Sequence, residues 1–232
     1  MLYQYVSALL TGRQIDFLDF FISICVTLFV VFCTMPIHEF AHAYAAHKLG
    51  DDTARLSGRL TLNPFAHIDI SGLVLIVLFG FGYAKAVPVN PRNFKDSKKG
   101  MAITAIAGPV SNLIMAFIFL AIGDTMGVFL TGSAAVAIST FFVLAGVINI
   151  NLAVFNLLPI PPLDGSRILG LLIPDKYYYK IMRYERQIML VIFVLLFLGF
   201  LTRPLQILSN FVYNGMNDII SVSYTHLTLP TN

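Results

Sequence analysis

A single long apolar stretch constrains the fold of this chain more than any other feature of its sequence. Residues 17–49 are apolar for most of their length and become polar only near the end. Because a helix of about 20 apolar residues can cross the hydrocarbon core of a bilayer, this stretch predicts a membrane-spanning helix. Pro36 lies within it and has no backbone amide, so we expect the helix to kink or open locally there.

The composition predicts a membrane environment for the rest of the chain as well. Hydrophobic residues make up 57% of the 232 residues, charged residues make up only 12%, and the mean hydropathy is +0.80. Soluble domains contain roughly a quarter charged residues, so a chain this apolar is expected to pack against the lipid bilayer as well as against itself. It is therefore predicted to be an all-α polytopic membrane protein. The net charge of +3 is too small to indicate a nucleic-acid partner.

Several further segments are apolar enough to be considered as spans, and we expect about 4–6 transmembrane helices in total. Residues 71–84 are apolar but about 14 residues long, which falls short of a full span. We interpret them as a re-entrant segment, with a tilted extra helix as the alternative, and expect a short strand in the loop before them. The other candidates are residues 101–122, 134–158 and 187–201, with 205–220 as a weaker one.

We expect one membrane-embedded domain over residues 1–220. Residues 221–232 are polar, rich in threonine and without helical or strand periodicity. We treat them as a separate tail, and the sequence leaves open whether it is native or an assembly artefact.

The distribution of basic residues predicts how the chain is oriented in the membrane. Loops rich in lysine and arginine stay on the cytoplasmic side. The loops at 48–67, 85–99 and 165–186 are basic, whereas residues 123–133 contain no lysine or arginine. We therefore expect the first three loops to be cytoplasmic and the last to be outside, in a multi-pass protein of the cell membrane.

Two histidines and a glutamate lie near the polar end of the first apolar segment. His38 and His42 are four residues apart, so on a helix both imidazoles share one face and can point at one ion. Glu39 follows His38 and can act as a general base toward a water activated by zinc. Such residues are costly in an apolar helix. This favours a site for one zinc ion per chain, with Glu39 as the catalytic residue, over a polar helix end that merely meets the interface.

A zinc site of this kind needs a third protein ligand and an open fourth position. Asp164 is our candidate, because the proline-rich stretch 156–165 closes the apolar segment 134–158 at the same predicted membrane face as His38 and His42. The prolines stiffen this stretch, and Gly165 is expected to permit an unusual backbone conformation. The alternative is an Asp–Gly turn without a ligand role.

These segments together resemble the site-2 protease family of intramembrane zinc metalloproteases. The resemblance covers residues 36–170 in the order typical of the family. Two of the segments are similar to those of compact bacterial members, and we see no inserted PDZ domain. The segments that carry the resemblance are HEFAH at 38–42, LNPFAHID at 62–69, KAVPVNP at 85–91, GPVSN at 108–112 and NLLPIPPLDG at 156–165.

The resemblance implies zinc bound by His38, His42 and Asp164, with Glu39 as general base. It also implies that Asn156 hydrogen-bonds the scissile peptide or its oxyanion. The implied substrate is a transmembrane segment of a membrane-tethered protein, cut within the bilayer on the cytoplasmic side. A substrate helix must unwind before its carbonyls can react, and a strand edge at residues 57–62 or 84–89 is a candidate to hold it.

Two other functions remain open from the sequence. The first is a metal-binding membrane transporter, which would need polar residues along a path through both leaflets. The ionisable residues instead cluster at one predicted depth, which favours the protease. The second is a scaffold without catalytic activity, against which the intact ligands and base argue.

Overall fold

The computed structural model describes residues 16–79, 82–129 and 131–228, and no β-strand is present among them. The chain forms two compact units, Met1–Ser111 and Asn112–Asn232. Helices of the first unit are α2 (Phe17–Phe29), the π-helical turn η1 (Val30–Thr34), α3 (Met35–Lys48), α4 (Thr53–Leu56), α5 (Pro64–His67), α6 (Ile70–Phe79) and the 3₁₀ turn η2 (Pro91–Asn93). α7 (Ser97–Phe129) begins in the first unit and ends in the second, which also contains α8 (Ser133–Asn156), α9 (Gly165–Leu169), α10 (Asp175–Met182), α11 (Glu185–Phe197) and α12 (Thr202–Thr228).

Three helical segments in the described part of the chain are long and apolar enough to cross a membrane. They are Phe17–Lys48, Ser97–Phe129 and Ser133–Asn156. A fourth span results if the bent pair Glu185–Phe197 and Thr202–Ser221, which meet at 85°, counts as one. The prediction of an all-α polytopic membrane protein is confirmed, with three or four spans among the described residues where 4–6 were expected.

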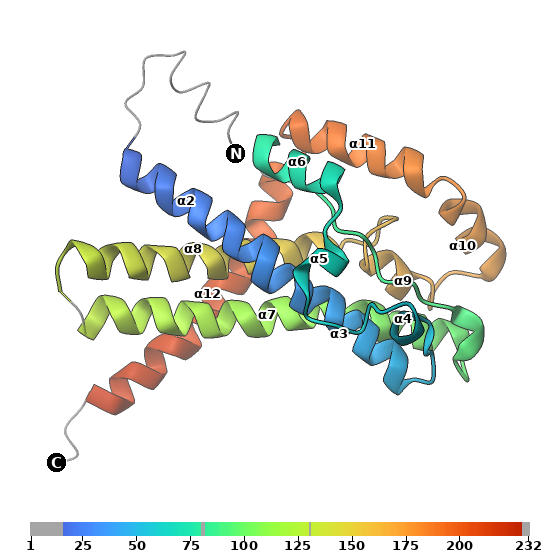
Figure 1. Ribbon diagram of the computed structural model, residues 1–232, viewed down its shortest axis with the longest axis horizontal. Coiled ribbons are helices and arrows are strands. Elements are labelled where there is room, and N and C mark those ends of the chain that lie inside the picture. The colour runs from blue at the N-terminus through green and yellow to red at the C-terminus, as the bar shows by residue number, and fades with distance from the viewer. Residues whose placement is uncertain (1–15, 80–81, 130, 229–232) are drawn as a thin grey trace. The chain divides into compact units, whose positions relative to one another are not determined.

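The first apolar segment is a helix that changes its hydrogen bonding just before the proline. α2, η1 and α3 follow one another end to end (Figure 1). Pro36 lies in the first turn of α3, where its missing amide costs little. The preceding π-helical turn lets the amide of Met35 bond the carbonyl of Val30, five residues back. The opening predicted at Pro36 is therefore present, as a π-helical turn on its N-terminal side.

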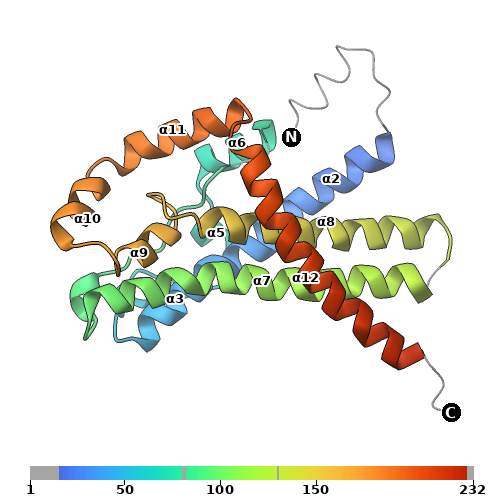
Figure 2. The ribbon, with the colours of Figure 1, turned by 180° about the vertical axis from the view of Figure 1, so that it is seen from behind.

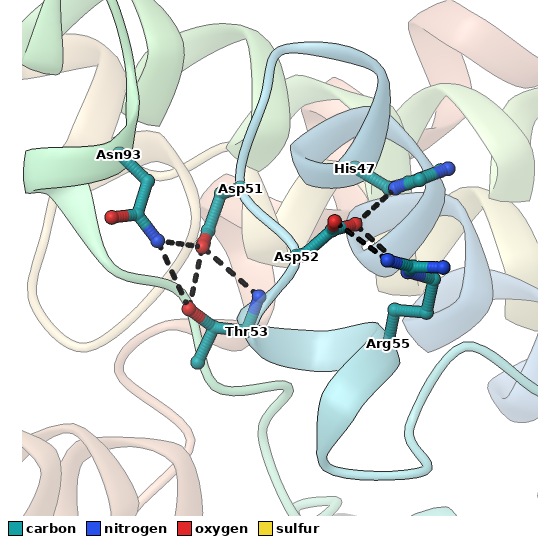
Figure 3. A network of polar contacts seen from close by, with 6 residues as sticks. All are labelled: His47, Asp51, Asp52, Thr53, Arg55 and Asn93. Carbon is teal, nitrogen blue, oxygen red and sulfur yellow. Dashed lines mark hydrogen bonds and ion pairs between the residues drawn. The ribbon is translucent and has the colours of Figure 1, made fainter.

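A buried carboxylate ties the end of α3 to the segment that leads into α7. Asp51 is fully buried and accepts hydrogen bonds from the amide and hydroxyl of Thr53 and from the side-chain amide of Asn93 at 2.7 Å (Figure 3). It also accepts one from the backbone amide of Asn90 at 2.7 Å. Burial raises the pKa of Asp51, but these hydrogen bonds to the ionised form outweigh it and hold the pKa below its usual value. Next to it, Asp52 forms a 2.6 Å contact with His47 and ion-pairs with Arg55 (Figure 3).

The segment predicted to be re-entrant contains a short helix. α6 is 10 residues long, and Asp69 caps it by accepting hydrogen bonds from the amides of Ser71 at 2.9 Å and Gly72 at 3.1 Å. The strand expected at residues 57–62 or 84–89 is absent, and this prediction is wrong. The amide of Arg59 bonds Ala54 in a turn, and the amide of Lys85 makes one bond to His67, so neither segment has a ladder partner.

In the second unit, α8 returns alongside the C-terminal part of α7 (Figures 1 and 2). The two helices approach closely at glycines, as in many membrane helix pairs. The hydroxyl of Ser139 donates to the carbonyl of Gly123 at 2.9 Å, and a Cβ at Gly146 would lie 2.8 Å from Leu120. α12 crosses α8 and completes a buried apolar cluster of Ala116, Leu120, Ile150, Val154 and Ile220.

Two predicted boundaries differ from the structure. The external loop expected at residues 123–133 is mostly helical, because α7 continues to Phe129 and α8 starts at Ser133. The glycines of this stretch do not interrupt the helix, since Gly123 packs against Val143 and Ser139 of α8. The basic loop expected at 165–186 contains the short helices α9 and α10. The single domain over 1–220 and the separate tail stay predictions.

Candidate metal centre

The two histidines and the glutamate of the motif lie on α3, as the sequence predicted. His38, Glu39 and His42 are each only 8% exposed. Glutamate is almost never buried to this extent unless it has a partner or a function. The structure thus places a carboxylate and two imidazoles together in an apolar helix, where their desolvation is costly.

The two imidazoles face each other through the nitrogens that a metal would use. Nε2 of His42 lies 3.0 Å from Nε2 of His38, and the ring centroids are 4.6 Å apart with the rings nearly perpendicular. Two nitrogens bound to one zinc at about 2.0–2.1 Å with tetrahedral angles are roughly 3.3–3.4 Å apart. The histidine pair therefore fits a zinc ion after a shift of a few tenths of an ångström.

The other nitrogen of His42 is held by the main chain of α7. Nδ1 of His42 lies 2.8 Å from the carbonyl oxygen of Thr104, and both residues are buried. A carbonyl oxygen can only accept, so Nδ1 carries the proton and Nε2 carries the lone pair. Metal-binding histidines are usually oriented by such a bond at their second nitrogen. No sequence pattern predicts this contact, which joins residues 62 positions apart through a backbone atom.

Asp164 lies in the second unit, in the tight loop between α8 and α9. It is half-buried, and its carbonyl accepts a hydrogen bond from the amide of Arg167 at 2.9 Å. Gly165 has an ordinary helical backbone, so the unusual conformation expected there is wrong. Its role is close packing, because a Cβ would lie 2.2 Å from the carbonyl oxygen of Leu157 and 2.4 Å from that of Leu158. Asn156, the residue expected at the oxyanion, is the last residue of α8 and is half-buried.

His47 and His67 have structural partners. His67 is fully buried between Arg59, whose guanidinium lies 3.3 Å from Nδ1, and the carbonyl of Thr61, 2.8 Å from Nε2. His47 contacts Asp52 at 2.6 Å near the end of α3. Both histidines therefore have protein partners outside the imidazole pair of α3.

Comparison with known proteins places these features in a family. The model of peptidase family M50 matches residues 123–200, which include Asp164. The chain is 44% identical to YwhC of Bacillus subtilis over 173 residues, or 73% of this chain and 78% of YwhC. It is 30% identical to Rip2 of Mycolicibacterium smegmatis, over 67% of this chain and 59% of Rip2. Both relatives are named "Putative zinc metalloprotease".

A more distant relative carries a similar name. "Zinc metalloprotease MJ0392" of Methanocaldococcus jannaschii is 25% identical over 66% of this chain and 36% of its own length. No solved structure matches the chain significantly. The family and the names of the relatives indicate a membrane-embedded zinc metalloprotease, and they confirm the resemblance to site-2 proteases. With 44% identity over more than two thirds of YwhC, the chain belongs to peptidase family M50.

Proposed function

We propose that this chain hydrolyses peptide bonds within transmembrane segments of membrane-tethered proteins, with zinc bound by His38, His42 and Asp164 and Glu39 as general base. The observation that carries the proposal is the pair of imidazoles meeting at 3.0 Å beside a buried glutamate. All three residues lie in a helical segment long and apolar enough to cross a membrane. A site at that place reaches substrates that are themselves in the bilayer.

Asp164 is the third ligand in this proposal because its loop is stiff and its side chain can be ionised. The loop is closed by hydrogen bonds from the amide of Leu163 to Ile160 and from the amide of Ser166 to Leu163, both 3.0 Å long. The hydroxyl of Ser166 also donates to the carbonyl of Leu163 at 2.7 Å. A carboxylate at zinc with two imidazoles leaves the fourth position open for water or substrate, as catalytic zinc sites require.

Bound zinc supplies a Lewis acid that polarises the peptide carbonyl and lowers the pKa of a water. Glu39 accepts the proton of the attacking water and passes it to the nitrogen of the leaving amine. Asn156 donates a hydrogen bond from its side-chain amide to the peptide oxygen as negative charge develops there. The low dielectric around the buried Glu39 strengthens these charge interactions.

We place the active site toward the cytoplasm of the cell membrane. His38 and His42 lie in the last turns of the first span, which ends at Lys48 and is followed by Arg55 and Arg59. Basic residues next to a span favour the cytoplasmic side. Hydrolysis inside a bilayer requires a supply of water. From the cytoplasmic side, water reaches this site over a short distance.

The test is cleavage in a reconstituted bilayer. Purified protein is placed in proteoliposomes with a set of tagged single-span membrane proteins that differ in transmembrane sequence. Mass spectrometry of the products locates the cut. We expect cuts inside a transmembrane segment, loss of cleavage after treatment with a zinc chelator, and recovery on adding zinc. Cleavage that persists without metal, or cuts confined to segments outside the bilayer, would reject the proposal.

A further inference from the structure

One turn of α7 contacts the metal-facing histidines of α3 at two points. The carbonyl of Thr104 binds His42, and Gly108, one turn later, lies against both His42 and His38. We propose that this turn positions the zinc-binding histidines, Thr104 by fixing the tautomer of His42 and Gly108 by leaving room for both rings. The inference rests on the proposed zinc site and assigns two positioning residues to it.

Thr104 acts through its main chain. A neutral imidazole has one N–H donor and one acceptor nitrogen, and zinc needs the acceptor. The 2.8 Å bond from Nδ1 of His42 to the Thr104 carbonyl reserves the proton for Nδ1 and directs Nε2 toward His38. Thr104 is 3% exposed, so water does not compete for this bond. The ring is thereby oriented for a metal before the metal arrives.

Gly108 acts by having no Cβ atom. A Cβ at this position would lie 2.3 Å from Nε2 and 2.5 Å from Cε1 of His42, and 2.6 Å from Cε1 of His38. Favourable contacts between such atoms begin at about 3.5 Å. The smallest side chain would therefore overlap the edges of both rings beside their metal-binding nitrogens. Both rings are buried and cannot move aside into solvent.

The residues next to these contacts are small and buried. Ala43, next to His42, is fully buried, and Ala105, next to Thr104, is 5% exposed. Small side chains let membrane helices approach closely. Pro109 follows Gly108 inside α7, and because it has no amide it leaves the carbonyl of Ala105 without its helical partner. This turn thus combines small side chains with a proline that removes one helical hydrogen bond.

The test compares Gly108→Ala with Gly127→Ala in the full-length protein. Gly127 lies on the same helix, and a Cβ there meets only the hydroxyl of Ser139, at 3.4 Å. Cobalt(II) is titrated into metal-free protein, and its visible d–d bands report affinity and ligand geometry. Zinc affinity follows from competition with a chelator. We expect Gly108→Ala to bind about 10–100-fold more weakly, as for other residues that orient a metal ligand, with altered cobalt bands and unchanged helical circular dichroism.

Gly127→Ala should match the wild type in affinity and spectrum. Wild-type affinity and bands in Gly108→Ala would overturn the role of Gly108. If wild-type protein itself binds no cobalt or zinc, the proposed zinc site fails and this inference fails with it. If the wild type binds metal and Gly108→Ala binds it equally well, the role of Gly108 is rejected while the proposed zinc site stands.

A second measurement on the wild type addresses Thr104 and does not depend on the variant folding. Protein labelled with ¹⁵N-histidine is loaded with zinc, and the ring nitrogens of His42 are assigned by their loss in His42→Asn. We expect a protonated Nδ1 that exchanges slowly with water, and a metal-shifted Nε2. An unprotonated Nδ1, or one that exchanges at once, would overturn the role of the Thr104 carbonyl.

Discussion

The guanidinium of Arg59 donates a hydrogen bond to Nδ1 of His67 at 3.3 Å, while Nε2 of His67 donates to the carbonyl of Thr61 at 2.8 Å. Arginine can only donate, so Nδ1 of His67 accepts this hydrogen bond and both ring nitrogens are in use. Arg59 also donates to the carbonyl of Lys85, whose amide binds the carbonyl of His67. The cluster joins the loop after α4 to the segment after α6 and leaves His67 no lone pair for a metal.

Replacing His67 should therefore affect stability and leave metal binding intact. We expect His67→Ala to keep its zinc and to lose about 1–3 kcal/mol of stability, because the buried Arg59 loses a partner. Zinc content by mass spectrometry and the midpoint of thermal unfolding measure the two effects. A folded variant without zinc would instead make His67 a ligand and displace Asp164 from that role.

Asp164→Ala should lose zinc while the helices stay folded, because two imidazoles alone hold the ion weakly. The matched control is Asp175→Ala, which removes an exposed carboxylate from the start of α10 in the same unit. We expect zinc at the wild-type level in the control. Full zinc content in Asp164→Ala, measured on the folded protein, would mean that a different residue completes the site.

The loop that carries Asp164 depends on the absence of a side chain at position 165. Gly165→Ala places a methyl group 2.2 Å from the carbonyl of Leu157, so the loop must open, at a cost of about 1–3 kcal/mol. We expect a lower unfolding midpoint together with weaker zinc binding. Gly215→Ala, in α12, is the control, since a Cβ there meets nothing within 4 Å. Equal stability of the two variants would contradict the close packing at Gly165.

Local patterns in the sequence predicted the parts of this molecule that depend on nearby residues. The spacing of His38 and His42 placed both on one helix face, and the apolar runs predicted the spans that contain α3 and α8. Pro36 predicted a local opening, although its form as a π-helical turn depends on how the backbone redistributes its hydrogen bonds. Hydropathy alone did not predict that α7 continues to Phe129. The glycines near its end suggested a loop, but they pack against α8 in the folded chain.

The sequence could not predict the contacts that main-chain atoms make. Any residue at position 104 presents the same carbonyl, so nothing marks Thr104 as the partner of His42. In the sequence Gly108 is simply part of a Gly–Pro pair. The need for a glycine there follows from its distances to the two histidine rings on α3. The same holds for Asp51, an aspartate next to another aspartate whose burial and four hydrogen bonds become evident only in the folded chain.

The network at Asp51 predicts a stability that depends on pH. Its hydrogen bonds hold the pKa of Asp51 below the usual value, so its contribution is complete above the unfolded pKa of about 3.9. That contribution is lost as the pH falls through the lower folded pKa. We expect Asp51→Asn to be about 1.5–3 kcal/mol less stable at pH 7, and the difference from wild type to shrink below about pH 4.

Unfolding midpoints of wild type and Asp51→Asn at pH 7, 5 and 3 check this, with Asp175→Asn as the exposed control. A difference that grows as the pH falls would contradict the assignment of an ionised, stabilising Asp51.

The most direct test of the account is the behaviour of Glu39→Gln. Glutamine keeps the size of the side chain and removes the base, so the variant should retain about one zinc per chain. Its cleavage of a transmembrane substrate in proteoliposomes should fall by about 10²–10⁴-fold, the usual contribution of a general base. Zinc retained with cleavage lost is the predicted result. Glu39→Gln that cleaves at the wild-type rate would contradict the role of Glu39 and, with it, the mechanism proposed for this site.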